Sequence, residues 1–186
     1  VNMTNHALFN LAGEGQNAGA LGHRLSIPAS AYTPVDARLI PTGEIRPVDG
    51  SAFDFRQPRL LSDGLVDHQE TQVRIARGYD HNFVLDKGRT PTAEPVALLE
   101  DPASDRRLEV FSTEPGLQLY SGNYLDGVLI GKSGGRYRRG AGIALEPQTF
   151  PNAPNEPGFP SARVDPDRPY RHVMVYRLTG PAPRST

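Results

Sequence analysis

The chain has 186 residues, enough for one domain with a sizeable core, and its 20 Lys and Arg residues nearly balance its 21 Asp and Glu residues. A net charge of −1 provides no field that would hold a polyanion or an anionic bilayer, so we expect neither nucleic acid nor a membrane as a partner. Cysteine is absent, which excludes disulfides, thiol catalysis and thiolate metal ligands.

Glycine and proline set the expected fold class. The 19 Gly and 18 Pro residues are spread along the whole chain, a pattern that favours short strands joined by turns. In chain order, strand-like runs are expected at residues 83–85, 96–99, 107–113, 117–120, 143–146 and 170–178. The proline-free stretch 59–78 keeps no sustained helical period, so we expect a loop with one helical turn. The pattern predicts an all-β sandwich.

The two ends of the chain and one proline-rich segment complete the predicted organisation. The segment 147–169 holds seven prolines, but Phe150 and Phe159 argue for an ordered loop packed on a sheet. One domain is expected over residues 1–179, followed by a frayed tail over 180–186. The sequence begins at Val1 with neither an initiator methionine nor a signal peptide, so we expect a chain that starts within a domain.

Two polar residues lie in strand-like runs where alternation gives them a face shared with small or aromatic neighbours. In the run 141–148, Glu146 shares a face with Ala144, and a partly desolvated glutamate has a raised pKa that suits a general base. In the run 115–120, Gln118 shares a face with Tyr120, and this pair could bond to sugar hydroxyls and stack on a ring. From the pattern alone, an exposed strand-end glutamate and a solvent-facing strand remain the alternatives.

Asp80 and His6 are the other candidates. Asp80 follows the turn glycine Gly78 and precedes an apolar run, where a turn or capping aspartate is the commoner use. His6 stands at the head of the apolar run 7–11, and the pattern alone favours a core histidine there. The five histidines never fall at the close spacing of a metal-ligand pair, so no metal site is expected.

The same segments resemble the galactose mutarotase (aldose 1-epimerase) family. Residues 2–13, Asn-Met-Thr-Asn-His-Ala-Leu-Phe-Asn-Leu-Ala-Gly, are similar to the family signature Asn-hydrophobic-Thr-Asn-His-x-x-Phe-Asn-Leu-x-Gly. The resemblance continues in order through residues 32–36, 39–45, 53–56, 78–83, 113–123 and 145–152. It implies an antiparallel supersandwich with a sugar cleft on one face, of which this chain is the C-terminal part.

The resemblance also implies roles for single residues. His6 would be the general acid that protonates the ring oxygen, and Glu146 the general base that takes the proton of the anomeric hydroxyl. Asp80 and Gln118 would hold sugar hydroxyls, with Ala7 and Leu8 also contacting the substrate. The implied substrates are free hexoses such as galactose and glucose, and no cofactor is needed because no redox step occurs. The cytoplasm is the expected location, with the periplasm or secretion left open.

Two departures from the family bear on the expected fold. Pro147 replaces the usual threonine after the proposed base, so we expect the strand to end there or to lie at an edge. The family's long N-terminal portion is missing, which indicates a fragment that a further segment or a second chain would complete.

Two alternative functions stay open. A hexose-phosphate epimerase would need a cationic clamp, for which the sequence offers Arg136, Arg138 and Arg139. A catalytically silent sugar-binding or regulatory protein is the other alternative.

Overall fold

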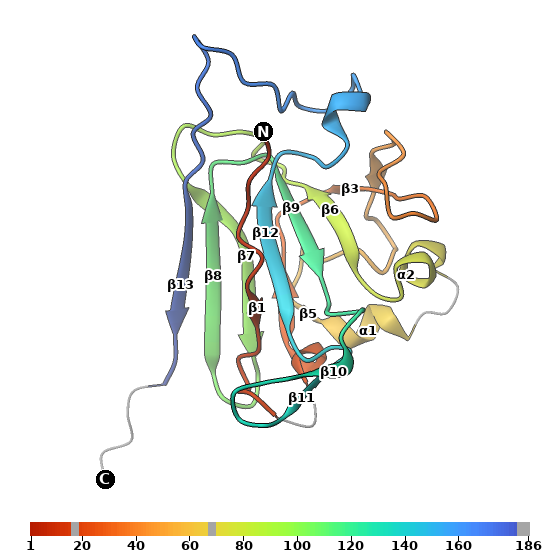
Figure 1. Cartoon of the computed structure of the whole chain (residues 1–186), viewed down its shortest axis with the longest axis vertical. Helices are drawn as coiled ribbons and strands as arrows, with labels where there is room; N and C mark the ends of the chain where they lie inside the picture. The colour runs from red at the N-terminus through yellow and green to blue at the C-terminus, as the bar shows by residue number, and fades with distance from the viewer. Residues whose placement is uncertain (16–18, 67–69, 182–186) are drawn as a thin grey trace.

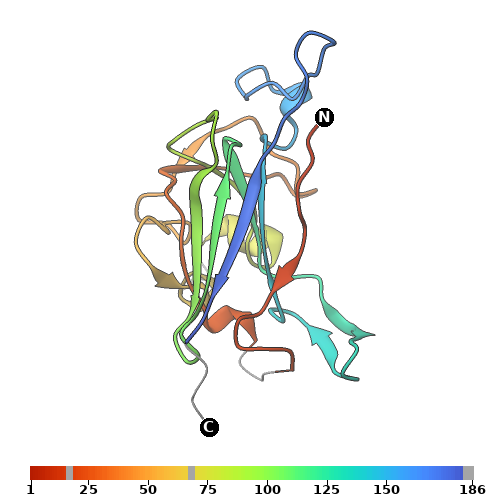
Figure 2. The same cartoon turned by 90° about the vertical axis from the view of Figure 1, so that its left-hand side faces the viewer.

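Two antiparallel sheets lie face to face in the computed structural model of the chain, which describes residues 1–15, 19–66 and 70–181 (Figure 1). The six-stranded sheet has the order β1-β12-β9-β6-β3-β4, and the five-stranded sheet has the order β13-β8-β7-β2-β5. Every ladder in both sheets is antiparallel. Figure 2, viewed from the side of β13, separates the two layers. The predicted antiparallel β-sandwich is therefore confirmed.

The strands are short, as the spread of glycine and proline predicts. The six-stranded sheet consists of β1 (Leu8–Phe9), β3 (Ala31–Thr33), β4 (Arg46–Pro47), β6 (Asp80–Val84), β9 (Gly116–Tyr120) and β12 (Ile143–Gln148). The five-stranded sheet consists of β2 (Arg24–Ser26), β5 (Arg59–Leu60), β7 (Glu94–Asp101), β8 (Arg106–Ser112) and β13 (Met174–Thr179). A separate hairpin, β10 (Asp126–Ile130) with β11 (Arg136–Arg138), projects beyond the lower end of β9 and β12 in Figure 1.

The core fills the space between the sheets. Each sheet contributes alternate apolar side chains to one contiguous cluster, which includes the fully buried Leu99 and Leu108 from one sheet and Leu117, Leu119 and Leu145 from the other. Burial of such side chains is the main favourable term for a fold of this kind. Because strand side chains alternate, the other face of the six-stranded sheet is free for polar groups.

The alternating runs predict β7, β8, β9 and β12 to within two residues at each end, whereas β6 begins at Asp80, three residues before the predicted run 83–85. The last predicted strand begins at Met174 and not at Tyr170, because residues 170–173 lie outside the ladder with β8. Strands β1 to β5 have only two or three residues, too few to show a period of two in the sequence.

The segment 59–78 differs from the predicted loop with one helical turn. It holds β5 and two short helices, α1 (Leu61–Leu65) and α2 (Thr71–Ala76). In α2 the side chain of Glu70 accepts a hydrogen bond from the backbone of Gln72, which caps the helix start. The prediction looked for a helical period of apolar residues, which this segment lacks. The helices instead depend on local hydrogen bonds and on burial of Val73 by the rest of the fold.

The proline-rich segment is an ordered loop, as predicted. Phe150 and Phe159 are buried and meet edge to face with 5.3 Å between ring centroids. Val84 of β6 packs against this pair, which ties the loop and its short 3₁₀ helix η2 (Ala153–Asn155) to the sheet. A second 3₁₀ helix, η1 (Ala20–Gly22), precedes β2.

The domain limits of residues 1–179 stay a prediction. Most of the predicted frayed tail, residues 182–186, lies outside the described residues. In the part of the chain that the structure describes, no helix has both the length and the apolar character needed to cross a bilayer.

Strand β12 continues past Pro147 to Gln148 and pairs with β9 over its last five residues. On its other side, β1 pairs only with Ala144 and Ile143. Of the two expectations for Pro147, a strand end and a strand edge, the first is therefore wrong. The second is confirmed, because no ladder partner lies beside Pro147 on the β1 side.

Candidate active site

Three neighbouring strands of the six-stranded sheet place polar side chains on one face. Glu146 of β12 lies opposite Gln118 of β9, and Gln118 lies opposite Asn82 of β6. Residues two apart on a strand share a face, and the intervening Leu117 and Leu145 are fully buried in the core. The polar side chains therefore belong to the outer face of the sandwich.

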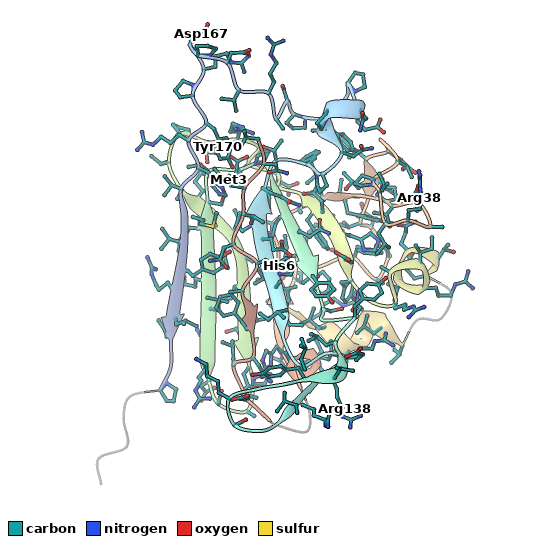
Figure 3. All side chains as sticks on the ribbon, in the orientation of Figure 1. Met3, His6, Arg38, Arg138, Asp167 and Tyr170 are labelled. Carbon is teal, nitrogen blue, oxygen red and sulfur yellow. The ribbon has the colours of Figure 1, made fainter. Side chains whose placement is uncertain are left out.

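His6 reaches this face from the segment just before β1. Its Nε2 lies 3.4 Å from Oε1 of Glu146, and its ring stands edge-on to Tyr120 with 5.8 Å between ring centroids. The side chain of His6 is 60% exposed and that of Glu146 is 8% exposed. Figure 3 shows His6 over the middle of the sheet, beside β12. The two interpretations drawn from the pattern alone, a core histidine and an exposed strand-end glutamate, are therefore wrong.

The pKa of the Glu146 carboxyl is shifted toward neutral pH. Burial raises the pKa of Glu146 to about 7, because its charged form loses hydration inside the protein. The positive charge of a protonated His6 opposes this shift, and the negative charge of Asp80 adds to it. A carboxylate with a pKa near neutrality is suited to exchange protons with a substrate at physiological pH.

Asp80 and Gln118 are joined beside this pair. Oδ1 of Asp80 accepts a hydrogen bond of 2.8 Å from Nε2 of Gln118. Burial raises the pKa of Asp80, whereas the bond from Gln118 and the charge of His6 lower it. Asp80 is thus the first residue of a strand, not a turn or capping aspartate, and Gln118 is half-buried and hydrogen-bonded, not an ordinary solvent-facing residue.

Gln148 is a member of the site that the sequence analysis missed. Its Nε2 donates to Oε1 of Gln118 at 3.2 Å, which orients the Gln118 amide with its Nε2 toward Asp80. Its position two residues after Glu146, on the same face of one strand, is the signal that could have identified it.

Ala7 and Leu8 connect His6 to β1. Leu8 pairs with Ala144, which shares the outer face of β12, and its side chain is 43% exposed. The backbone N–H of Ala7 donates to Oδ1 of Asn5 at 2.8 Å. Both residues lie beside the His6–Glu146 pair, and their contact with a sugar stays a prediction.

His81 shows how strand alternation separates two histidines. It follows Asp80 directly but points into the core, where burial lowers its pKa to about 3 and its Nε2 lies 3.1 Å from Oε1 of Gln72. It therefore remains a neutral core residue. Within residues 1–15, 19–66 and 70–181, no group of three or more His, Asp or Glu side chains is placed to hold a metal ion.

The arginines of residues 136–139 do not form a clamp beside the His6–Glu146 pair. Arg136 donates to the carbonyl of Gly127 at 3.0 Å, and Arg139 donates to the carbonyl of Arg77. Figure 3 shows Arg138 on the projecting hairpin, away from His6 over the middle of the sheet. The structure thus removes the basis for a hexose-phosphate site at these arginines.

The chain that forms this antiparallel sandwich and its histidine–glutamate pair matches a known protein family. The family model for aldose 1-epimerase covers residues 1–177. The chain belongs to the aldose 1-epimerase family.

Individual relatives agree with this assignment. Galactose mutarotase of Mus musculus is 43% identical over 179 residues, and that of Sus scrofa is 46% identical over 176 residues. These matches cover 96% and 95% of this chain, and 50% and 49% of the two relatives. A solved structure of a GalM/aldose epimerase homologue from C. elegans superposes with a TM-score of 0.79 at 30% identity, over 97% of this chain and 51% of that one. The chain spans about half the length of the curated relatives it matches.

Proposed function

We propose that this chain carries the acid–base pair of an aldose 1-epimerase that interconverts the α- and β-anomers of free hexoses. The observation that carries the proposal is the 3.4 Å approach of His6 Nε2 to Glu146 Oε1 on the polar sheet face. In a hemiacetal sugar, the ring oxygen and the anomeric hydroxyl are bonded to the same carbon. An acid and a base that act on these two oxygens must therefore be close neighbours, as His6 and Glu146 are.

The proposed reaction needs only two proton transfers and one rotation. Glu146 takes the proton of the anomeric hydroxyl while protonated His6 gives its proton to the ring oxygen. The bond between the anomeric carbon and the ring oxygen breaks, and the anomeric carbon becomes a free aldehyde. Rotation about the bond between the first two carbons and reversal of both proton transfers close the ring on the opposite face. No atom changes oxidation state overall, so the reaction requires no redox cofactor.

Asp80 and Gln118 are the proposed sugar-binding residues. Gln148 orients Gln118, and Gln118 donates to Asp80, so the polar atoms that face the sugar are held in fixed directions. The relatives are galactose mutarotases, which favours galactose as the first substrate to test. Glucose is the other free hexose that the family resemblance implies. The half-length match supports a further polypeptide segment, or a second chain, that completes the sugar cleft.

A coupled assay of α- to β-anomer conversion tests the proposal. Galactose and glucose are supplied to this polypeptide and to a version extended at its N-terminus to the length of its relatives. We expect turnover in the extended protein, because the cleft is then complete. Absence of turnover in both proteins, with sugar binding retained, would instead identify a silent sugar-binding protein on the same scaffold.

A further inference from the structure

Only part of the β12 edge that faces the N-terminal segment has a ladder partner. Strand β1 pairs only with Ile143 and Ala144 and does not extend along the rest of β12. In an antiparallel strand, the backbone groups of residues two apart point to the same side. The backbone groups of Leu145, Pro147 and Thr149 therefore continue the edge that begins at Ile143.

Each of these three positions has a different substitute for a ladder partner. The carbonyl of Leu145 accepts a hydrogen bond of 2.8 Å from Oη of Tyr176, which comes from the opposite sheet. Pro147 has no N–H to satisfy. The amide of Asn2 bonds both backbone groups of Thr149, donating to its carbonyl at 2.7 Å and accepting from its N–H at 3.0 Å. Side chains thus satisfy the Leu145 carbonyl and both backbone groups of Thr149 without a strand.

The N-terminal segment is consequently attached to β12 at two ends and departs from it in between. Asn2 bonds to Thr149 at one end, and Leu8 and Phe9 form β1 at the other. We call the intervening residues 3–7 the His6 arch. Because the arch lies outside the ladder, the side chain of His6 lies over the site face and approaches Glu146.

Further contacts hold the two ends of the arch. The carbonyl of Met3 accepts a hydrogen bond of 3.3 Å from Oη of Tyr170, and Figure 3 shows these two residues together above His6. At the other end, the ring of Phe9 stacks on Tyr176 with 5.5 Å between centroids. Tyr176 therefore contacts both the strand that follows the acid and the strand that carries the base.

We propose that Asn2 and Tyr176 are positioning residues, which hold the His6 arch and β12 in register so that His6 and Glu146 act on the two oxygens of one anomeric carbon. This inference rests on the proposed function and extends it to residues that do not touch the sugar. Asn2 anchors the backbone of the acid, and Tyr176 anchors the backbone of the base. Neither supplies or removes a proton in the reaction.

The electrostatics of the site provide a readout that does not depend on turnover. The charged and titratable groups that face Glu146 are His6 from the arch, Asp80 from β6 and Tyr176 from β13. His6 is the only one of these three described groups whose charge favours ionised Glu146. A loosened arch therefore raises the pKa of Glu146, because the imidazolium moves away while Asp80 stays.

The test compares Asn2→Asp and Tyr176→Phe with matched surface variants, in whichever form of the protein turns over sugar. Asn2→Asp removes the donor to the Thr149 carbonyl and keeps the side-chain shape, and Tyr176→Phe keeps the stack on Phe9 but removes the hydroxyl. Each is expected to lower kcat about tenfold with KM changed less than about twofold. The controls Asn155→Asp, at an exposed residue, and Tyr137→Phe, at a half-buried residue of β11, lie away from the arch and should leave kcat unchanged.

Two further measurements separate positioning from a general loss of structure. In a His6→Gln background, Asn2→Asp should cause no additional loss of kcat, because its effect acts through His6. The carboxyl ¹³C signal of Glu146 should titrate at higher pH in Asn2→Asp than in the wild type, and most of this shift should be absent in the His6→Gln background, where the added negative charge is still present but His6 is not. If kcat and this titration are both unchanged, the positioning role is overturned. If no form of the protein turns over sugar, the proposed function fails, and the titration still decides whether Asn2 holds His6 beside Glu146.

Discussion

Glu114 and Glu146 are both buried glutamates, but their surroundings differ. Glu114 is 0% exposed, and its Oε2 accepts a hydrogen bond of 2.7 Å from Oγ1 of Thr149 and lies 3.0 Å from Nη2 of Arg89. Glu146 is also buried, and its charged neighbours are the titratable His6 and the negative Asp80. One carboxylate is compensated by a permanent cation and a hydroxyl, and the other is not.

This comparison teaches how one fold uses the same side chain for two purposes. A buried carboxylate with an arginine and a hydroxyl as partners ties together the segments that carry them. A buried carboxylate without a permanent cation is poised between its protonated and ionised forms. The difference predicts that Glu146 matters for turnover and Glu114 for stability, and each part of that statement can be tested.

The largest expected effect is on turnover. Glu146→Gln should lower kcat about a thousandfold, because the amide keeps the shape of the side chain but cannot accept a proton. Sugar binding should change little, as measured by calorimetric titration with galactose. Glu109 is a half-buried glutamate on β8 paired with Arg177, and Glu109→Gln serves as the control that should retain full turnover. Turnover near that of the wild type in Glu146→Gln would contradict the role of Glu146 as the base.

The second effect is the pH dependence of catalysis. Glu146 must be ionised to accept a proton, and burial raises its pKa to about 7. We therefore expect kcat/KM to fall about tenfold for each pH unit below the pKa of Glu146. A pH profile with galactose measures this limb directly. An acid limb centred where ordinary glutamates titrate would contradict the desolvated base.

The third effect concerns the other glutamate. Glu114→Gln should lower the free energy of unfolding by about 1–3 kcal/mol, because Arg89 loses its buried counter-ion. Thermal unfolding at pH 7 measures the loss, and kcat should stay within about threefold of the wild type. A large loss of kcat without a lower melting temperature would reverse the roles assigned to the two glutamates.

The smallest effect is a gain of stability from losing the base. The raised pKa means that the folded protein keeps a proton on Glu146 that the unfolded chain releases between about 4.5 and 7. Stability of the wild type therefore falls as the pH rises through this window, by the linkage between proton binding and folding. Glu146→Gln lacks this penalty and should be more stable than the wild type at pH 8, by roughly 1 kcal/mol, but not at pH 4. Equal unfolding curves of the two proteins at pH 8 would indicate that Glu146 is well solvated.

Part of the site could be predicted because strand alternation is local. The runs around Glu146 and Gln118 have a period of two, which places each polar residue on a face opposite to leucines. The resemblance to the family then distinguished the functional interpretation of His6 from the core histidine that the pattern favours. Pro147 could be connected with an edge because a missing N–H is a property of the residue itself.

The sequence alone was sufficient for the all-β class, the central strands, the family and the four polar candidates His6, Asp80, Gln118 and Glu146, because periodicity, turn residues and signatures are properties of neighbours along the chain. Only the tertiary structure decided which carboxylate is compensated by a cation, that Gln148 orients Gln118, and that Asn2 and Tyr176 bond to the edge of β12. These contacts join residues far apart in the chain. Desolvation and charge pairing depend on distances in space, and a linear pattern does not contain those distances.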